Sequence, residues 1–95
     1  MRLNGKLGLN QQDEYMLFSG GRNINLSSEL NTLLLSDVKI AVRDIYYDEV
    51  LFYGIGKLVL EKVGKCNYWY HVGDIDLDEV LWNNTGRNVE VVVVS

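Results

Sequence analysis

Three aspartates at alternate positions are the residues of this 95-residue chain that most suggest chemistry. Asp74, Asp76 and Asp78 stand in the stretch GDIDLDEV, and Glu79 follows them directly. Carboxylates at positions 1, 3 and 5 begin a calcium-binding loop, but such a loop also needs glycine at position 6 and glutamate at position 12. Because Glu79 and Thr85 occupy those two positions, the stretch departs from the calcium pattern at both.

A second copy of this pattern favours a structural role. Residues 23–28 (NINLSS) match residues 74–79 (DIDLDE), with asparagine or serine in place of each aspartate. These residue types share the ability to accept hydrogen bonds from free backbone N–H groups at a turn or helix start. The sequence therefore predicts that both stretches cap short helices. A weak metal site is the alternative, and we predict no metal.

The remaining reactive side chains form no catalytic pattern. His71 is the only histidine, and it lies among the aromatic residues of an expected strand. Cys66 is the only cysteine, with Lys65 as its neighbour, and spacing supplies neither residue with a catalytic partner. Thirteen acidic residues always offer carboxylate pairs, so such pairs do not indicate an enzyme. We expect a protein that is not an enzyme, without catalytic residues or cofactors.

The segment RDIYYDEVLFYG, residues 43–54, is the candidate interaction surface. It mixes tyrosines with a few charged residues, and protein interfaces are enriched in this mixture. The predicted partner-binding residues are Asp44, Tyr46, Tyr47, Asp48, Glu49 and Tyr53. The structural alternative is a hairpin whose tyrosines cover the fold while its acids are solvated at the turn.

An internal repeat organises the chain. GKLGL at 5–9 recurs as GKLVL at 56–60, and VKIAV at 38–42 recurs as VEVVV at 89–93, both after 51 residues. Matches in the same order at one spacing predict a tandem duplication.

The duplication defines the expected domain organisation. We predict a single domain of residues 1–95, with repeats 1–42 and 52–95 joined by the connector 43–51. YMLFSG, beginning at Tyr15, matches YWYHVG, beginning at Tyr68, once two residues are inserted.

Each repeat has the same expected elements. Alternating leucines indicate a half-buried strand, an aromatic and aliphatic run indicates a second strand, and a short helix and a third strand follow. The prediction is a mainly β (α+β) protein, a small pseudo-twofold barrel or sheet of two β-β-α-β repeats. This layout resembles the six-stranded barrels of the cradle-loop group, including double-psi barrels, which implies interlocked halves. A small Sm-like or SH3-like barrel is the alternative.

Composition restricts the setting and the partners. The net charge of −4 disfavours nucleic acid, and no apolar run is long enough to span a bilayer, so we expect a cytoplasmic protein without membrane contact. Proline is absent and nine asparagines accompany a single alanine, which is typical of phages and low-GC bacteria.

Three functions fit these observations. The first is a non-enzymatic, acidic protein-binding module, an inhibitor or adaptor from a phage or mobile element that acts on a basic surface of a host protein. The second is a barrel that binds a small molecule or nucleotide between its halves, near the glycine-rich turns at 19–22 and 73. The third binds nucleic acid through a group of cations: Arg2, Lys6, Lys57, Lys62 and Lys65.

The last strand bears on self-association. VEVVVVS at 89–95 is apolar on both faces towards its end, as in a central or covered strand. If it lies at an uncovered edge instead, it predicts pairing into a homodimer.

Overall fold

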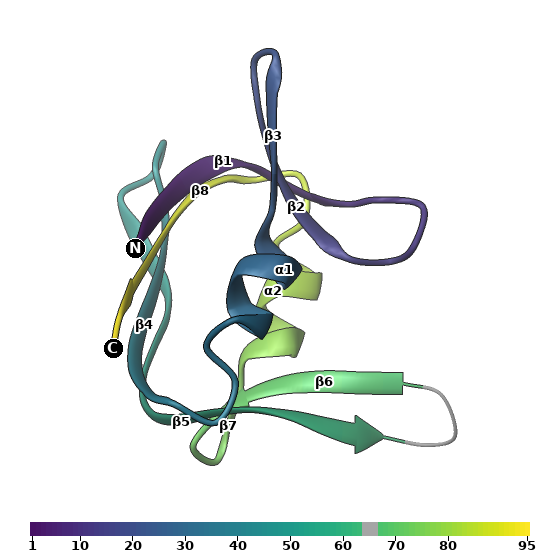
Figure 1. Ribbon diagram of the computed structural model, residues 1–95. Helices are drawn as coiled ribbons and strands as arrows, with labels where there is room; N and C mark the ends of the chain where they lie inside the picture. Colours follow the sequence, from purple (N-terminus) through teal and green to yellow (C-terminus); the bar gives the residue numbers. More distant parts are fainter. Residues whose placement is uncertain (64–66) are drawn as a thin grey trace.

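The protein is built around one antiparallel sheet of eight strands (Figure 1). The computed structural model describes residues 1–63 and 67–95. The strands are β1 (Arg2–Leu9), β2 (Tyr15–Ser19), β3 (Arg22–Asn25), β4 (Asp37–Asp44), β5 (Glu49–Val63), β6 (Asn67–Val72), β7 (Ile75–Asp76) and β8 (Asn88–Val94), and the helices are α1 (Leu26–Asn31) and α2 (Leu77–Asn83). Their order across the sheet is β3-β2-β1-β8-β4-β5-β6-β7. The mainly β prediction is confirmed, but in the described part of the chain the sheet is open and does not close into a barrel.

The same order of elements occurs twice. The first half consists of three strands (β1 to β3), the helix α1 and a fourth strand (β4). The second half has the same series, with β5 to β7, α2 and β8. The expected β-β-α-β unit omitted β3 and β7, which are only four and two residues long. Strands this short contain too few residues to show the alternation that reveals a strand in a sequence.

A pseudo-twofold axis relates the two halves. The strand order reads the same from either edge when each strand is replaced by its equivalent in the other half. At the centre of the sheet Ala41 on β4 pairs directly with Val92 on β8, which is its own equivalent at the 51-residue spacing. The pairs on either side of this point follow the same symmetry.

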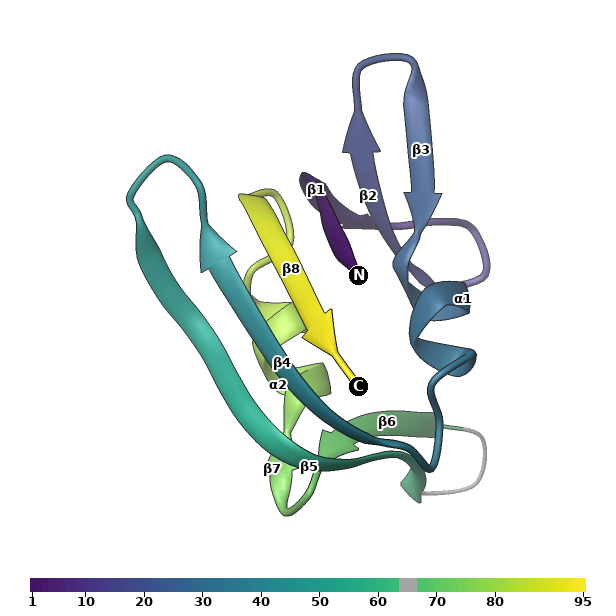
Figure 2. The ribbon, with the colours of Figure 1, turned by 60° about the vertical axis from the view of Figure 1, so that its left-hand side comes forward.

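The halves also exchange their last strands. β4 pairs with β5 and β8 of the second half, while β8 pairs with β1 and β4. Figure 2 shows β8 between β1 and β4, with the two chain ends close together. Each half therefore completes the sheet of the other half.

The strand pairing corrects one alignment of the two halves. Tyr15 on β2 lies opposite Leu9, and Tyr70 on β6 lies opposite Leu60. Since Leu9 and Leu60 are equivalent, Tyr15 corresponds to Tyr70 and not to Tyr68. The sequence match was misleading because both strands are rich in aromatic residues.

Two equivalent glycines bend β1 and β5. The first residues of β1 pair with β8 and its last residues pair with β2. In the same way, the first part of β5 pairs with β4 and its last part pairs with β6. Gly5 and Gly56 stand near these changes of partner, with φ of 155° and 152°. A Cβ on Gly5 would lie 3.0 Å from the carbonyl oxygen of Phe18, and one on Gly56 would lie 3.0 Å from the backbone of Gly73. Glycine is needed for both the conformation and the close approach.

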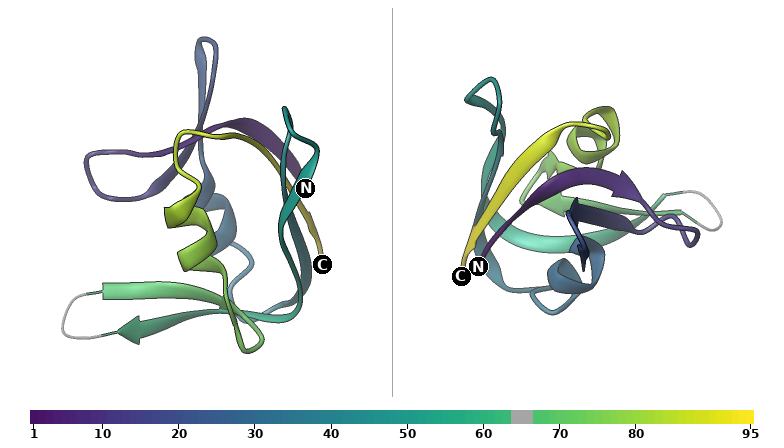
Figure 3. Two further views of the ribbon diagram at one scale, coloured as in Figure 1. Left: turned by 180° about the vertical axis from the view of Figure 1, so that it is seen from behind. Right: turned by 90° about the horizontal axis from the view of Figure 1, so that it is seen from above.

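The bends curve the sheet around the two helices. Figure 1 shows both helices on the concave face of the curved sheet, and the view from above in Figure 3 shows α1 and α2 apart from each other. Four leucines of the helices, Leu26, Leu30, Leu77 and Leu81, are fully buried in one core with the sheet. Because neither helix exceeds seven residues, this packing rather than helix propensity stabilises them.

The terminal strand is central, as the first of its two interpretations required. Val89, Val91 and Val93 are buried, and strands flank β8 on both sides. The apolar-edge argument for a homodimer is therefore removed, and a homodimer stays a prediction without this support.

Candidate functional site

The acidic stretch is a helix start, as the repeat indicated. The side chain of Asp76 caps α2 by accepting a 3.0 Å hydrogen bond from the backbone N–H of Glu79. Asn25 caps α1 in the same way, with a 2.8 Å bond from Ser28. No group of three or more histidine, cysteine or acidic side chains in residues 1–63 and 67–95 is arranged to hold a metal ion.

Asp78 has a different role from its neighbours, because it ties the helix to a strand. Its Oδ1 accepts a 3.1 Å hydrogen bond from the backbone N–H of Tyr70. The equivalent Ser27 accepts a 2.8 Å bond through Oγ from the N–H of Tyr15. Each short helix is thus fastened to the second strand of its own half.

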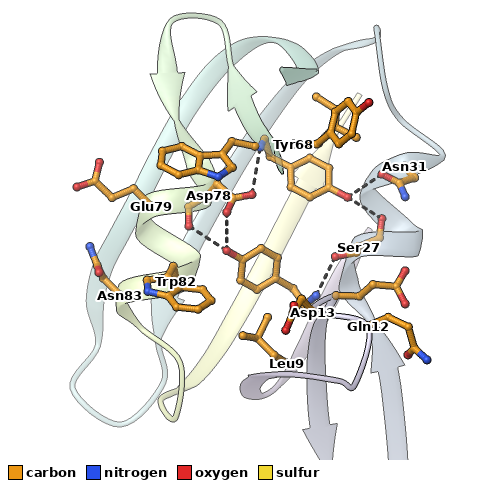
Figure 4. A pocket seen from close by; sticks show the side chains of 15 residues that line it. Leu9, Gln12, Asp13, Ser27, Asn31, Tyr68, Asp78, Glu79, Trp82 and Asn83 are labelled. Carbon is orange, nitrogen blue, oxygen red and sulfur yellow. Dashed lines mark hydrogen bonds between the residues drawn. The ribbon is translucent and has the colours of Figure 1, made fainter. Parts of the chain in front are cut away.

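The same two tyrosines then join the halves. The hydroxyl of Tyr15 lies 2.6 Å from Oδ2 and 3.1 Å from the backbone carbonyl of Asp78, across the pseudo-twofold axis. The hydroxyl of Tyr70 reaches α1, 2.7 Å from Oδ1 of Asn31 and 3.3 Å from the carbonyl of Ser27 (dashed lines in Figure 4). Burial raises the pKa of Tyr70 and of Tyr15, and for Tyr15 the hydrogen bond to Asp78 adds to the rise. Both phenols therefore stay protonated and act as donors.

The predicted interaction segment forms the β4–β5 hairpin, and its first acid is not on the surface. The Asp44 side chain is buried, with 1% of the residue exposed. Its Oδ1 accepts hydrogen bonds from the backbone N–H groups of Tyr46 (2.9 Å) and Tyr47 (3.1 Å), and Arg87 lies 3.2 Å from its Oδ2. The bond from Tyr47, with those from Arg87 and Tyr46, holds the pKa of Asp44 below its usual value. Asp44 therefore shapes the turn and is not available to a partner.

The other predicted residues of the hairpin are exposed. Tyr46 and Tyr47 are each 78% exposed at the tip, and Tyr53 is exposed on β5. Val50 and Ile55 lie on the same hairpin and are also more than half exposed. We call these five residues, Tyr46, Tyr47, Val50, Tyr53 and Ile55, the hairpin patch.

Arginines accompany the acids beside the hairpin patch. The Arg43 guanidinium lies 2.7 Å from Asp48, and Arg87 lies 3.7 Å from Glu49. Asp48 and Glu49 therefore do not form a free acidic surface, and the expected attraction to a basic partner is weak at this place.

A cleft opens between the two helices on another side of the protein (Figure 4). It has a volume of about 980 Å³. α2 contributes Asp78, Glu79, Trp82 and Asn83 to its lining, and the loop before β2 contributes Gln12, Asp13 and Glu14. Tyr68, Trp69 and Tyr70 of β6, Leu9, Leu60, Tyr15, Ser27 and Asn31 complete the lining.

The two halves differ where they line the cleft. Equivalent positions carry Asp13 and Tyr68, Glu14 and Trp69, or Asn31 and Trp82, so the second half is aromatic where the first is polar. The buried leucines show no such contrast: Leu7 corresponds to Leu58, and Leu26 to Leu77. The sequence analysis overlooked this site. The positions at which the two repeats diverge can nevertheless be found by aligning them.

The remaining predicted residues do not gather into a site. His71 lies on β6 with Nε2 3.3 Å from a Glu61 carboxylate oxygen, and Cys66 lies outside the described residues. The turn at 19–22 is the tip of the β2–β3 hairpin (Figure 1), and neither it nor Gly73 lines the cleft. A ligand near these turns stays a prediction.

The candidate cations for nucleic acid are divided between two strands. Arg2 and Lys6 lie on β1, while Lys57 and Lys62 lie on β5, with β8 and β4 between them. Lys65 lies outside the described residues. Among the described elements, neither helix is long and apolar enough to cross a membrane.

Comparison with known proteins yields no relative. No protein-family model, curated protein or solved structure matches this chain.

Proposed function

We propose that this chain is a non-enzymatic protein-binding module whose docking surface is the hairpin patch. The observation that supports the proposal is the turn at its tip, where two largely exposed tyrosines are fixed by one buried carboxylate. Exposed aromatic residues are the side chains that most often dominate protein interfaces.

The hydrogen bonds of Asp44 favour binding because they order the turn before a partner arrives. Tyr46 and Tyr47 have their backbone positions set by Asp44, and Arg43 holds Asp48 across the turn. A surface that is already ordered loses less conformational entropy on association. The hairpin thus presents its tyrosines at a low entropic cost.

The chemistry of the patch indicates the kind of partner. Its five residues are aromatic or aliphatic, and the two acids beside it, Asp48 and Glu49, have arginines close by. We propose a protein partner with an apolar surface rather than the basic surface expected from the sequence. The composition suits an inhibitor or adaptor from a phage or mobile element that acts on a host protein in the cytoplasm.

The exchanged strands suit the same role, because they give a small chain a firm scaffold. We propose that the two halves arose by duplication of one unit. Their arrangement is similar to that of cradle-loop barrels, in an open form.

An affinity capture with matched variants tests the docking surface. The bait is the full chain, incubated with lysate of a low-GC bacterium, and the test variant carries Tyr46→Ser, Tyr47→Ser and Tyr53→Ser. The control variant carries Phe18→Ser and Leu35→Ser, two exposed apolar residues away from the hairpin patch. Both variants must first show the circular dichroism spectrum and melting temperature of the parent.

The proposal predicts a protein that the parent and the control retain and the test variant loses, with at least a tenfold difference in yield. Equal retention by all three baits, or retention of no protein, would contradict it.

A further inference from the structure

We infer that the cleft between α1 and α2 is a binding site for a cationic side chain, best an arginine, presented by a segment of a partner protein. The inference does not depend on the hairpin patch. It rests on the aromatic lining of the cleft, its charge and the fixed position of one carboxylate.

Exposed aromatic rings give the cleft a surface of the right kind. Trp82 is 59% exposed, Tyr68 is 54% exposed and Trp69 is 40% exposed, although all three line a concave site. Both tryptophans of the chain are in this group. Rings left open to water in a hollow are suited to stacking on a flat group or to holding a cation over the ring face.

The charge of the cleft determines which ligand fits these rings. Four carboxylates line it, from Asp13, Glu14, Asp78 and Glu79, and no lysine or arginine of residues 1–63 and 67–95 does. Unlike Asp48 and Glu49 at the hairpin, these acids have no arginine close by in the described part of the chain. A cation would therefore find both aromatic faces and an excess of negative charge.

Two of the four carboxylates are available to a ligand. Both oxygens of Asp78 already accept hydrogen bonds from the tyrosines, and Oε1 of Glu14 accepts from two asparagines. The carboxylates of Asp13 and Glu79 are exposed, and no described residue pairs with them. The exposed side chains of the cleft that are available to a cation are therefore Asp13, Glu79, Trp82, Tyr68 and Trp69.

The Asp13 carboxylate is carried by an ordered turn. Oδ1 of Asn10 accepts hydrogen bonds from the N–H groups of Gln12 (2.9 Å) and Glu14 (3.0 Å), and the N–H of Asp13 donates to the carbonyl of Asn10 (3.1 Å). Asp13 itself adopts a left-handed conformation with φ of 60°, which aspartate and asparagine tolerate better than most residues. Figure 4 shows Asp13 and Glu79 on opposite sides of the cleft, so negative charge borders the cleft on both sides.

Arginine suits this combination better than lysine does. Its planar guanidinium stacks on indole faces while its edge donates to carboxylates, and it is less strongly hydrated than an ammonium group. A partner segment bound here would not obstruct the hairpin patch, because Figures 1 and 3 place the β4–β5 hairpin on the opposite side of the molecule from the β1–β2 loop.

Tryptophan fluorescence provides the test, since both reporter residues line the cleft. The probe is an acetylated and amidated Gly-Ser nonapeptide with arginine at its centre. Matched peptides carry lysine or citrulline there, citrulline having nearly the shape of arginine without its charge. We expect saturable binding of the arginine peptide, binding of the lysine peptide about threefold weaker, and binding of the citrulline peptide at least about tenfold weaker.

Variants separate the two contributions. Asp13→Asn with Glu79→Gln removes two charges while retaining shape and the left-handed turn, and should weaken the arginine peptide about fivefold. Trp82→Leu keeps an apolar side chain without the indole and should weaken it by a similar factor, with Trp69 still reporting. Asp48→Asn with Glu49→Gln removes two charges from the hairpin instead and should change the affinity by less than about twofold.

The outcomes are decisive in either direction. The order arginine, lysine, citrulline, together with weakening confined to the cleft variants, would support the inference. Equal binding of the arginine and citrulline peptides would show that the cleft takes a neutral polar ligand, and the inference would fail. No saturable binding of the arginine peptide would also overturn it.

Discussion

At the scale of single residues, the buried Ser27 and Asp44 and the half-buried Asp78 hold neighbouring elements together. Ser27 and Asp78 accept hydrogen bonds from the backbone N–H groups of Tyr15 and Tyr70, respectively. Asp44 accepts hydrogen bonds from the backbone N–H groups of the hairpin turn. In the part of the chain that the structure describes, no buried side-chain nitrogen or oxygen lacks a partner. These groups are costly to disturb, since a buried polar atom that loses its partner stays unsatisfied.

The hydroxyl of Tyr15 provides the first prediction. Tyr15→Phe leaves the ring in place but removes the donor to Asp78, and should lower the free energy of unfolding by about 1–2 kcal/mol. Chemical denaturation would measure the loss, with Tyr53→Phe, an exposed tyrosine, as the control that should change by less than about 0.5 kcal/mol. Equal effects of the two substitutions would show that the link between the halves is not stabilising.

The second prediction concerns acid. Because the folded-state pKa of Asp44 is depressed, its contribution to stability is present above the ordinary value of 3.8 and is lost as the pH falls through the folded-state value. Asp44→Asn should therefore melt at a lower temperature than the parent at neutral pH, and the difference should shrink below about pH 4. Melting curves from pH 2 to 7 would check this, and a difference independent of pH would refute it.

The same residue shows where sequence reasoning stops at this scale. Asp44 and Asp48 stand in one tyrosine-rich segment with similar neighbours, yet only Asp48 is exposed. Burial of Asp44 depends on Arg87, which is far away in the chain and approaches through the pairing of β4 with β8. By contrast, the caps at Asn25 and Asp76 are local interactions, and the sequence was sufficient to predict them.

At the scale of elements, the shape of the sheet depends on two bent strands. Gly5→Ala and Gly56→Ala each place a Cβ 3.0 Å from backbone atoms in a conformation that favours glycine. We expect each to lower the free energy of unfolding by at least about 2 kcal/mol. Gly21→Ala is the control, because a Cβ there meets nothing within 4 Å. Tolerance of alanine at both bends would contradict this account.

Elements were predictable where their signals are strong and local. The alternating leucines of β1 and β5, the aromatic and aliphatic runs of β2 and β6, and the apolar patterns of β4 and β8 predicted six of the eight strands. β3 and β7 were missed. The alignment of β2 with its equivalent β6 was wrong by two residues, because tyrosines at several positions match equally well. Only cross-strand pairing, Tyr15 with Leu9 and Tyr70 with Leu60, distinguishes these registers.

At the scale of the whole molecule, the exchanged strands should make each half dependent on the other. A fragment of residues 1–47 lacks the strands that flank β4, and a fragment of residues 48–95 lacks those that flank β8. We expect each fragment alone to show the circular dichroism of an unfolded chain and an equimolar mixture to recover that of the parent. A fragment that folds alone would show that the halves are independent.

The duplication was inferred from the sequence because repeats preserve order and spacing, and interlocked halves were expected from the resemblance to cradle-loop barrels. The open form of the sheet was not predicted from the sequence. Closure depends on whether the edge strands β3 and β7 meet, and neither strand was expected. The cleft is a property of the assembled halves, formed by residues as distant as Asp13 and Trp82. A sequence read segment by segment does not place such residues together.

The central claim, that the β4–β5 hairpin docks a protein, is tested most directly by photo-crosslinking. A benzoyl-phenylalanine in place of Tyr47 is compared with one in place of Phe18, an exposed aromatic residue on the β2–β3 hairpin. The account predicts one dominant protein adduct at position 47, suppressed by excess unlabelled parent but not by excess Tyr46→Ser/Tyr53→Ser variant, and none at position 18. The absence of a competable adduct at position 47, or the same adduct at both positions, would contradict it.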